Sequence, residues 1–202
     1  MRLIVVGQKW LGEQALRLCQ ERGYDVAAVV VPGADDRLAR AAGMDGVHVD
    51  IVSGRLLASQ LPAGCELIVC AHARAFITAE ARHQARLGAI GYHPSLLPRH
   101  RGRDAVRWAL HMREQMTGGT VYWMDDGADT GPIAAQDWCW IDQADTPETL
   151  WRDKLAPMGV RLIGQVLDQI SAGHYPMKPQ DPALATWEPS FNPKPLSAKS
   201  AP

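Results

Sequence analysis

Two short stretches of the sequence hold the residues best suited to chemistry. The first runs from Gly91 to Gly102 and sets His93, Ser95 and several basic residues among two prolines and a glycine. The second runs from Asp125 to Gly131 and contains three aspartates, of which Asp129 is the last. A carboxylate beside a histidine stabilises the imidazolium, which can steady negative charge on a tetrahedral intermediate or move a proton. Together the two stretches favour acyl-type transfer.

Each stretch also has a plainer interpretation. One histidine among seven is more often a surface or core residue than a catalyst. Asp129-Thr130-Gly131 also has the composition of an ordinary turn. Ser95 lacks the G-x-S-x-G pattern of a nucleophile elbow, which disfavours a covalent serine mechanism. The remaining histidines show no spacing typical of metal ligands, so we predict no metal site.

His93 is predicted to lie at the end of a strand. The apolar residues 89–92 predict a strand that ends at His93, and Pro94 and Pro98 then force an irregular, extended loop. In an open parallel sheet the ligand crevice lies at the carboxyl ends of the strands. We therefore expect the two chemistry-bearing stretches to meet at that edge.

The whole chain reads as an α/β fold. A strand at 3–6, a helix at 12–22 and a strand at 25–31 form a βαβ unit, which implies a parallel sheet with a right-handed crossover. The elements predicted after this unit are a helical segment at 35–42, an edge strand at 47–51, a helix at 56–61, a strand at 66–71, a loop at 72–78, helices at 79–86 and 103–113, strands at 117–124 and 132–139, and a helix from 145 to 172.

The opening unit lacks the dinucleotide fingerprint. That motif needs glycines at its first, third and sixth positions, which here are Gly7, Lys9 and Gly12. No acidic residue ends the second strand, since Asp35 and Asp36 come only after a Pro-Gly turn. NAD binding is therefore disfavoured.

Composition limits the class of protein. The chain has 202 residues, 47% hydrophobic, with a net charge of −1, which predicts one domain over residues 1–190 and a disordered tail over 191–202. A near-neutral charge argues against nucleic acid or anionic membranes as partners. The four cysteines show no CxxC spacing, and no apolar run is long enough for a signal peptide or a membrane span. We expect a cytoplasmic protein and leave its oligomeric state open.

The two stretches carry a resemblance. His93-Pro94-Ser95-Leu96-Leu97-Pro98 with Arg101-Gly102, followed by Asp126-Gly127-Ala128-Asp129-Thr130-Gly131-Pro132-Ile133, resembles the formyltetrahydrofolate-using family of formyltransferases and hydrolases. Within that family the chain is most similar to the amino-terminal hydrolase domain of 10-formyltetrahydrofolate dehydrogenase. The resemblance covers roughly residues 1 to 190 and is strongest from 88 to 160.

The resemblance implies a Rossmann-like formyltransferase fold, a mostly parallel twisted sheet with helices on both faces. It implies 10-formyltetrahydrofolate as co-substrate, His93 as the catalytic histidine, Asp129 as its partner and a cis Leu97–Pro98 bond. We expect Ser95, Arg99 and Arg101 to bind substrate. The pterin slot that the resemblance implies comprises Arg74, Ala75, Phe76, Ile77, Ala89, Ile90, Gly91, Tyr92, Asp125, Asp126 and Gly127.

One position departs from the family pattern. Most members place an asparagine two residues before the histidine, where it donates a hydrogen bond to the formyl oxygen, and here that residue is Gly91. Loss of one such donor typically costs about 2.7–4 kcal/mol of transition-state stabilisation. The leading hypothesis is formyl transfer to an amine or hydroxylamine of a small acceptor. The alternatives are hydrolysis to formate and a non-catalytic folate- or nucleotide-binding module.

Overall fold

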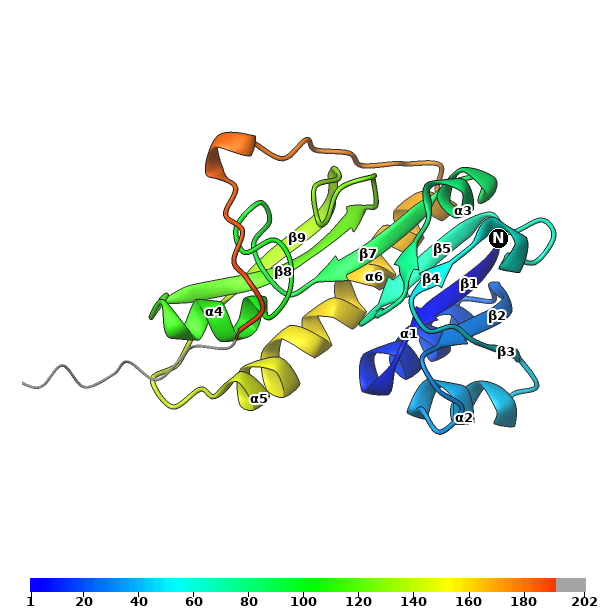
Figure 1. Ribbon diagram of the computed structural model, residues 1–202, viewed down its shortest axis with the longest axis horizontal. Coiled ribbons are helices and arrows are strands. Elements are labelled where there is room, and N and C mark those ends of the chain that lie inside the picture. The colour runs from blue at the N-terminus through cyan, green and yellow to red at the C-terminus, as the bar shows by residue number, and fades with distance from the viewer. Residues whose placement is uncertain (192–202) are drawn as a thin grey trace, which may run out of the picture.

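The protein is built on one mixed sheet. The structure, a computed structural model, describes residues 1–191. Its seven-stranded twisted sheet has the order β3-β2-β1-β5-β7-β8-β9 (Figure 1). The strands of this sheet are β1 Arg2–Gly7, β2 Asp25–Val31, β3 His48–Ile51, β5 Leu67–Ala71, β7 Ala89–His93, β8 Met116–Trp123 and β9 Ile133–Trp140. The first five run parallel, whereas β8 and β9 are antiparallel to their neighbours, which confirms a mostly parallel sheet.

Helices cover both faces of the sheet, as predicted. The central strands are apolar on both faces, and Leu3 to Val6 are at most 1% exposed, as is typical of a doubly covered parallel sheet. One apolar cluster joins the sheet to α1 Lys9–Glu21, α2 Arg37–Met44 and α6 Ala156–Ser171. A second cluster on the other face includes α3 Ala79–Gln84 and the small sheet of β4 Arg55–Leu56 and β6 Phe76–Ile77.

The helix predicted at residues 56–61 is wrong. Leu56 instead lies in β4, where it pairs with Ile77 of β6, and only a 3-10 turn at Ala58–Gln60 is helical. Leu56 is fully buried and Leu61 is 7% exposed, both in the cluster that includes α3. Strand pairing and burial at its two ends therefore override the helical pattern of this short segment.

The long helix predicted from 145 to 172 is interrupted. Its start is confirmed: the Thr146 hydroxyl accepts a hydrogen bond from the Thr149 N–H at 3.2 Å, and α5 Pro147–Thr149 follows. A π-helical turn then spans Leu150–Leu155 before α6 begins. Pro157 lies in the first turn of α6 and has no N–H for the carbonyl four residues earlier. The wider π turn occurs where that regular hydrogen bond is missing.

The C-terminal segment returns to the antiparallel half of the sheet. After α6 the chain (orange to red in Figure 1) runs along β9 and descends toward α4 Ala105–His111. The Ile133 N–H donates to the Lys178 carbonyl at 2.8 Å, and the Arg101 N–H donates to the Thr186 carbonyl at 3.1 Å. The segment therefore fastens the loop that follows His93. Of the predicted tail, only Phe191 lies within the described residues.

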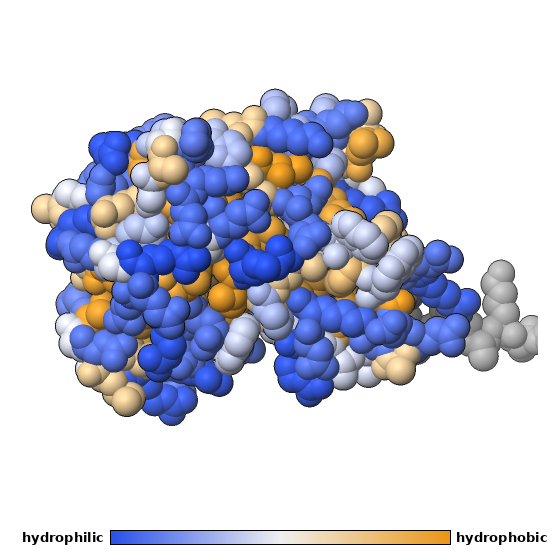
Figure 2. Space-filling model, turned by 180° about the vertical axis from the view of Figure 1, so that it is seen from behind, coloured by the Kyte–Doolittle hydropathy of each residue, from blue (hydrophilic) through white to orange (hydrophobic). Residues whose placement is uncertain are grey.

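Polar side chains cover most of one face of the molecule (Figure 2). The face in Figure 2 is largely hydrophilic, with hydrophobic residues scattered between the polar ones. Within residues 1–191, no helix combines the length and the apolar character needed to cross a membrane.

Candidate functional site

The candidate site begins where β7 ends. His93 is the last residue of β7, which places it at the carboxyl edge of the sheet. The side chains of Ile90 and Tyr92 belong to the apolar cluster under α6, whereas Ala89 belongs to the cluster on the opposite face. By the two-residue period of a strand, Gly91 and His93 share the face of Ala89. The side chains of Ile90 and Tyr92 thus point away from the predicted slot. Only the main-chain atoms of these two residues can contact a ligand there.

Both ring nitrogens of His93 face oxygen atoms. Nε2 lies 2.7 Å from the carbonyl oxygen of His100, and Nδ1 lies 3.5 Å from Oδ2 of Asp129. The side chains of His93 and Asp129 are 8% and 17% exposed. An imidazolium donates from both nitrogens, so this pair of acceptors suits the charged ring. The arrangement can hold a positive charge beside a reacting carbonyl group.

Asp129 is held from several sides. Its φ of 56° is left-handed, a conformation that aspartate tolerates better than most residues. Oδ2 accepts the Gly102 N–H at 2.8 Å, and Oδ1 accepts the Tyr122 hydroxyl at 2.6 Å. Its main-chain carbonyl accepts the side-chain amide of Gln180 at 2.9 Å. The Asp129 carboxylate is therefore anchored by the loop after β7 and by β8, and its main chain by the C-terminal segment.

The loop after β7 is stabilised by contacts within the protein. The cis Leu97–Pro98 bond that the resemblance implies is present. Ser95 is fully buried, and its hydroxyl donates to the Arg99 carbonyl at 2.6 Å. The Arg99 guanidinium pairs with Glu114, and the Arg101 guanidinium donates to Oε1 of Gln180 at 2.7 and 3.1 Å. The predicted substrate contacts of Ser95, Arg99 and Arg101 remain predictions, and all three side chains already have protein partners.

Arg82 connects the two sides of the predicted pterin slot. Its buried guanidinium donates to the Ile77 carbonyl at 2.8 Å and pairs with the Asp126 carboxylate. The turn on that side is tightened by Asp125, whose Oδ1 accepts the Gly127 N–H at 3.1 Å and the Thr130 hydroxyl at 2.6 Å. The predicted residues at 74–77 and 125–127 are therefore joined through an arginine outside both stretches.

Sequence reasoning did not single out Arg82, Tyr122 or Gln180. Arg82 lies in a short helix, and only its 5% exposure in the folded chain marks it as a bridging residue. Tyr122 lies in an apolar strand, where an aromatic residue is typical of a core. Gln180 comes about 50 residues after the aspartate that it supports. Their contacts depend on tertiary pairing, so no local pattern could have identified them.

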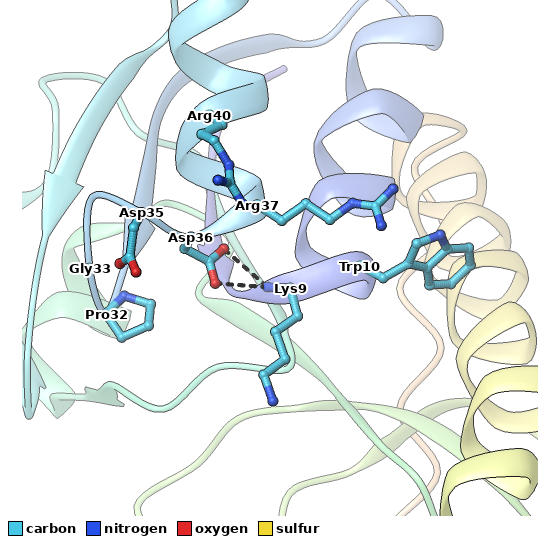
Figure 3. A pocket seen from close by; sticks show the side chains of 8 residues that line it. All are labelled: Lys9, Trp10, Pro32, Gly33, Asp35, Asp36, Arg37 and Arg40. Atoms are coloured by element: carbon cyan, nitrogen blue, oxygen red, sulfur yellow. Dashed lines mark hydrogen bonds between the residues drawn. The ribbon is translucent and has the colours of Figure 1, made fainter.

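A pocket lies further along the same edge of the sheet. This edge pocket, with a volume of about 640 Å³, adjoins the carboxyl ends of β1 and β2 (Figure 3). Its lining combines cationic, acidic and apolar residues, namely Lys9, Trp10, Pro32, Gly33, Asp35, Asp36, Arg37 and Arg40.

The Asp36 side chain lies against the amino terminus of α1. Its carboxylate accepts the Lys9 N–H at 3.0 and 3.1 Å and also the Leu38 N–H at 2.8 Å, so it caps α2 and contacts the first residue of α1 (Figure 3). In a dinucleotide-binding fold the pyrophosphate lies at this helix terminus. In this chain a carboxylate of the protein itself makes that contact.

His72 stands at the end of the strand between the edge pocket and His93. It follows β5, its ring packs edge-on against Trp151 at 5.3 Å, and its φ is 60°. Burial lowers the pKa of His72, and the nearby charges of Lys9 and Arg74 lower it further. The neutral imidazole of His72 is therefore favoured near pH 7.

The described residues contain no metal cluster, and two of the cysteines are poor nucleophiles. No group of three or more histidines, cysteines or carboxylates in residues 1–191 is arranged to hold a metal ion. Burial raises the pKa of the Cys70 thiol, like that of Cys19, to about 12. A thiolate nucleophile at either position is therefore disfavoured at neutral pH.

Comparison with known proteins identifies the family. The sequence profile described as "Formyl transferase" matches residues 53–167. The chain is 35% identical over 201 residues to the mitochondrial 10-formyltetrahydrofolate dehydrogenase of Homo sapiens, which covers 93% of this chain and 22% of that protein. It is 46% identical over 101 residues to the methionyl-tRNA formyltransferase of Methylacidiphilum infernorum, and this alignment covers 50% of this chain and 31% of that protein. The chain thus spans about a fifth of the length of the dehydrogenases that it matches.

Solved structures share the fold. Glycinamide ribonucleotide transformylase 1 from Symbiobacterium toebii superposes with a TM-score of 0.78 at 24% identity, covering 90% of this chain and 94% of that one. An N-formyltransferase from Helicobacter canadensis, solved with folinic acid and dTDP-3-aminofucose, superposes with a TM-score of 0.75 at 16% identity, covering 92% and 70% of the two chains. With the profile match across more than half of its residues, the chain belongs to the formyl transferase family.

Proposed function

We propose that this chain takes a formyl group from 10-formyltetrahydrofolate and transfers it to an amine or hydroxylamine of a small acceptor. The observation that carries the proposal is the buried pair at the carboxyl end of β7, where His93 Nδ1 lies 3.5 Å from Asp129 Oδ2. The proposal treats residues 1–190 as the catalytic unit.

The His93–Asp129 pair suits the charge changes of formyl transfer. The acceptor nitrogen attacks the formyl carbon, and the C=O electron pair moves to the oxygen, which becomes an oxyanion. The His93 imidazolium stabilises this oxyanion, and Asp129 favours the charged ring. When the C=O bond re-forms, the bond to N10 of the folate breaks. N10 takes a proton, and the acceptor nitrogen loses one through water next to Asp129.

The residues proposed to bind the pterin offer polar groups that suit the edges of a flat ring. The two sides of the proposed pterin slot are the main chain at 74–77 and the turn at 125–127, and Arg82 spans them through the Ile77 carbonyl and the Asp126 carboxylate. Phe76 is 48% exposed and offers an aromatic surface. Main-chain groups supply donors and acceptors to such a ring without requiring specific side chains.

The edge pocket supports an acceptor larger than water. It lies on the same edge of the sheet as His93, and Lys9 and Arg40 add positive charge to its lining (Figure 3). Arg37 pairs with Glu13, so its charge is partly balanced within the protein. Lys9 and Arg40 suit a carboxylate or phosphate group on the acceptor, although Asp35 and Asp36 give the lining an equal number of negative charges.

Hydrolysis is the second candidate. The chain is 35% identical over 93% of its length to the mitochondrial 10-formyltetrahydrofolate dehydrogenase of Homo sapiens. Its sequence resembles the amino-terminal domain of that enzyme, which is a hydrolase. Water would then attack the formyl carbon, and formate would leave with tetrahydrofolate. The same His93–Asp129 pair would stabilise the intermediate.

One assay separates these candidates. Purified protein is mixed with 10-formyltetrahydrofolate, with and without a panel of anionic and neutral amines, and tetrahydrofolate and formate are measured. Transfer predicts tetrahydrofolate release that depends on the amine, with a formylated product and little formate. Equal amounts of formate and tetrahydrofolate without any amine indicate hydrolysis. Binding of folinic acid with no turnover under any condition would contradict both and favour a non-catalytic folate-binding module.

A further inference from the structure

Tyr122 and Gly91 form a matched pair across two strands. They face each other in the antiparallel register of β7 and β8. A Cβ atom placed on Gly91 would lie 3.3 Å from Cε1, 3.4 Å from Cζ and 3.4 Å from the hydroxyl oxygen of Tyr122. The phenol ring of Tyr122 therefore occupies the space that a side chain at residue 91 would need.

The hydroxyl of Tyr122 is directed at the site. It donates to Oδ1 of Asp129 at 2.6 Å, while Oδ2 of the same carboxylate faces His93. Burial, and next the charge of Asp129, raise the pKa of Tyr122 well above its usual range. Because the phenol keeps its proton, it serves the carboxylate as a constant donor.

We propose that Tyr122 is a positioning residue that holds Asp129 against His93. Residue 91, two positions before His93, has no side chain, and the Tyr122 hydroxyl would lie 3.4 Å from a Cβ at that position. With Gly102 N–H on one carboxylate oxygen and Tyr122 O–H on the other, the orientation of Asp129 is set by two donors from different elements. This inference rests on the proposed function, in which His93 and Asp129 act on the formyl group.

A structural role alone would make different predictions. A buried tyrosine also stabilises a fold through its ring and one hydrogen bond. Tyr24 is a matched control, because its hydroxyl lies 2.7 Å from the Ser171 hydroxyl and donates to the Leu167 carbonyl at 3.2 Å, outside the site. Tyr122→Phe and Tyr24→Phe each keep the ring and remove one hydroxyl.

The first experiment measures kcat and KM for 10-formyltetrahydrofolate. Because hydrogen bonds to charged groups are the strong ones, we expect Tyr122→Phe to lower kcat about 10- to 100-fold and to leave KM within about 2-fold. Tyr24→Phe should leave both constants within about 2-fold. In an Asp129→Asn background, Tyr122→Phe should change kcat by less than about 2-fold, since residues that act through one another are not additive. Wild-type kcat in Tyr122→Phe, or full additivity with Asp129→Asn, would overturn the inference.

The second experiment needs no turnover. The ring-proton NMR signal of His93 is identified by its loss in His93→Ala and followed in both tyrosine variants. A shift in Tyr122→Phe but not in Tyr24→Phe supports the path from Tyr122 through Asp129 to His93, and an unchanged signal in Tyr122→Phe overturns it. If the wild type neither transfers nor hydrolyses formyl groups, the proposed function fails, and this NMR result still decides the role of Tyr122.

Discussion

Two aspartates in loops that follow strands of the same sheet have different surroundings. Asp36 follows β2, and its carboxylate accepts main-chain N–H groups from Lys9 and Leu38. Asp129 follows β8, accepts one main-chain N–H and one tyrosine hydroxyl, and faces His93 at 3.5 Å. Both are well supplied with hydrogen bonds, so the number of bonds does not distinguish them.

The difference lies in what each carboxylate faces. Main-chain N–H groups at a helix terminus gain stability from a carboxylate, and they have no second protonation state to offer. A histidine can change its charge, and in a buried place the neighbouring carboxylate controls that charge. Asp36 therefore has the surroundings of a cap, whereas Asp129 faces a side chain that can change its charge.

The largest effect should come from the His93–Asp129 pair. We expect His93→Ala or Asp129→Asn to lower kcat at least about 10²-fold, because each removes an electrostatic or proton-transfer contribution to the transition state. Affinity for folinic acid should remain close to that of the wild type in calorimetric titrations. Near wild-type kcat in both variants would contradict the assignment of the site.

A smaller effect should follow from crowding Tyr122. In Gly91→Ala the new Cβ would lie 3.3 Å from the ring of Tyr122. We expect the ring to move and the hydrogen bond from the Tyr122 hydroxyl to Asp129 to lengthen. We expect kcat to fall about 10-fold, the order of one hydrogen bond to a charged group. Gly43→Ala is the control, because no atom lies within 4 Å of a Cβ at that position. Equal kcat values for the two alanine variants would show that the ring position does not matter.

Substitution of Asp36 should reduce the stability of the fold. Asp36→Ala removes the cap of α2 and the contact with the first N–H of α1, and we expect it to lower the free energy of unfolding by about 0.5–2 kcal/mol. Urea denaturation measures this loss. An unchanged denaturation midpoint would mean that water replaces the carboxylate without cost.

The smallest effect should come from an exposed aspartate. Arg22 lowers the pKa of Asp168, whose side chain is 59% exposed. A lowered pKa stabilises the fold above the unfolded value of about 3.9, and this contribution is lost as pH falls through the folded value. We expect Asp168→Asn to cost about 0.2–1 kcal/mol at pH 7, less in high salt, and nothing at a pH below both values. A loss that persists in acid would indicate packing rather than charge.

The sequence by itself determined the order of elements and the chemistry-bearing stretches. Continuous apolar runs predicted β1, β2 and β5, and the Pro-punctuated loop and the acidic turn offered His93 and Asp129 as candidates, which lie 3.5 Å apart in the structure. These features could be predicted because hydrophobic runs, prolines and turn residues act on their immediate neighbours. The helical pattern at 56–61 failed where strand pairing with β6 outweighed it.

Only the tertiary structure decided what surrounds the two catalytic candidates. The register of β7 with β8 places Tyr122 across Gly91, and the folded chain brings Arg82 to Asp126 and Gln180 to the carbonyl of Asp129. Such contacts depend on how strands and segments far apart in the chain pair and pack. A one-residue change of register would turn Tyr122 to the opposite face and leave the sequence unaltered.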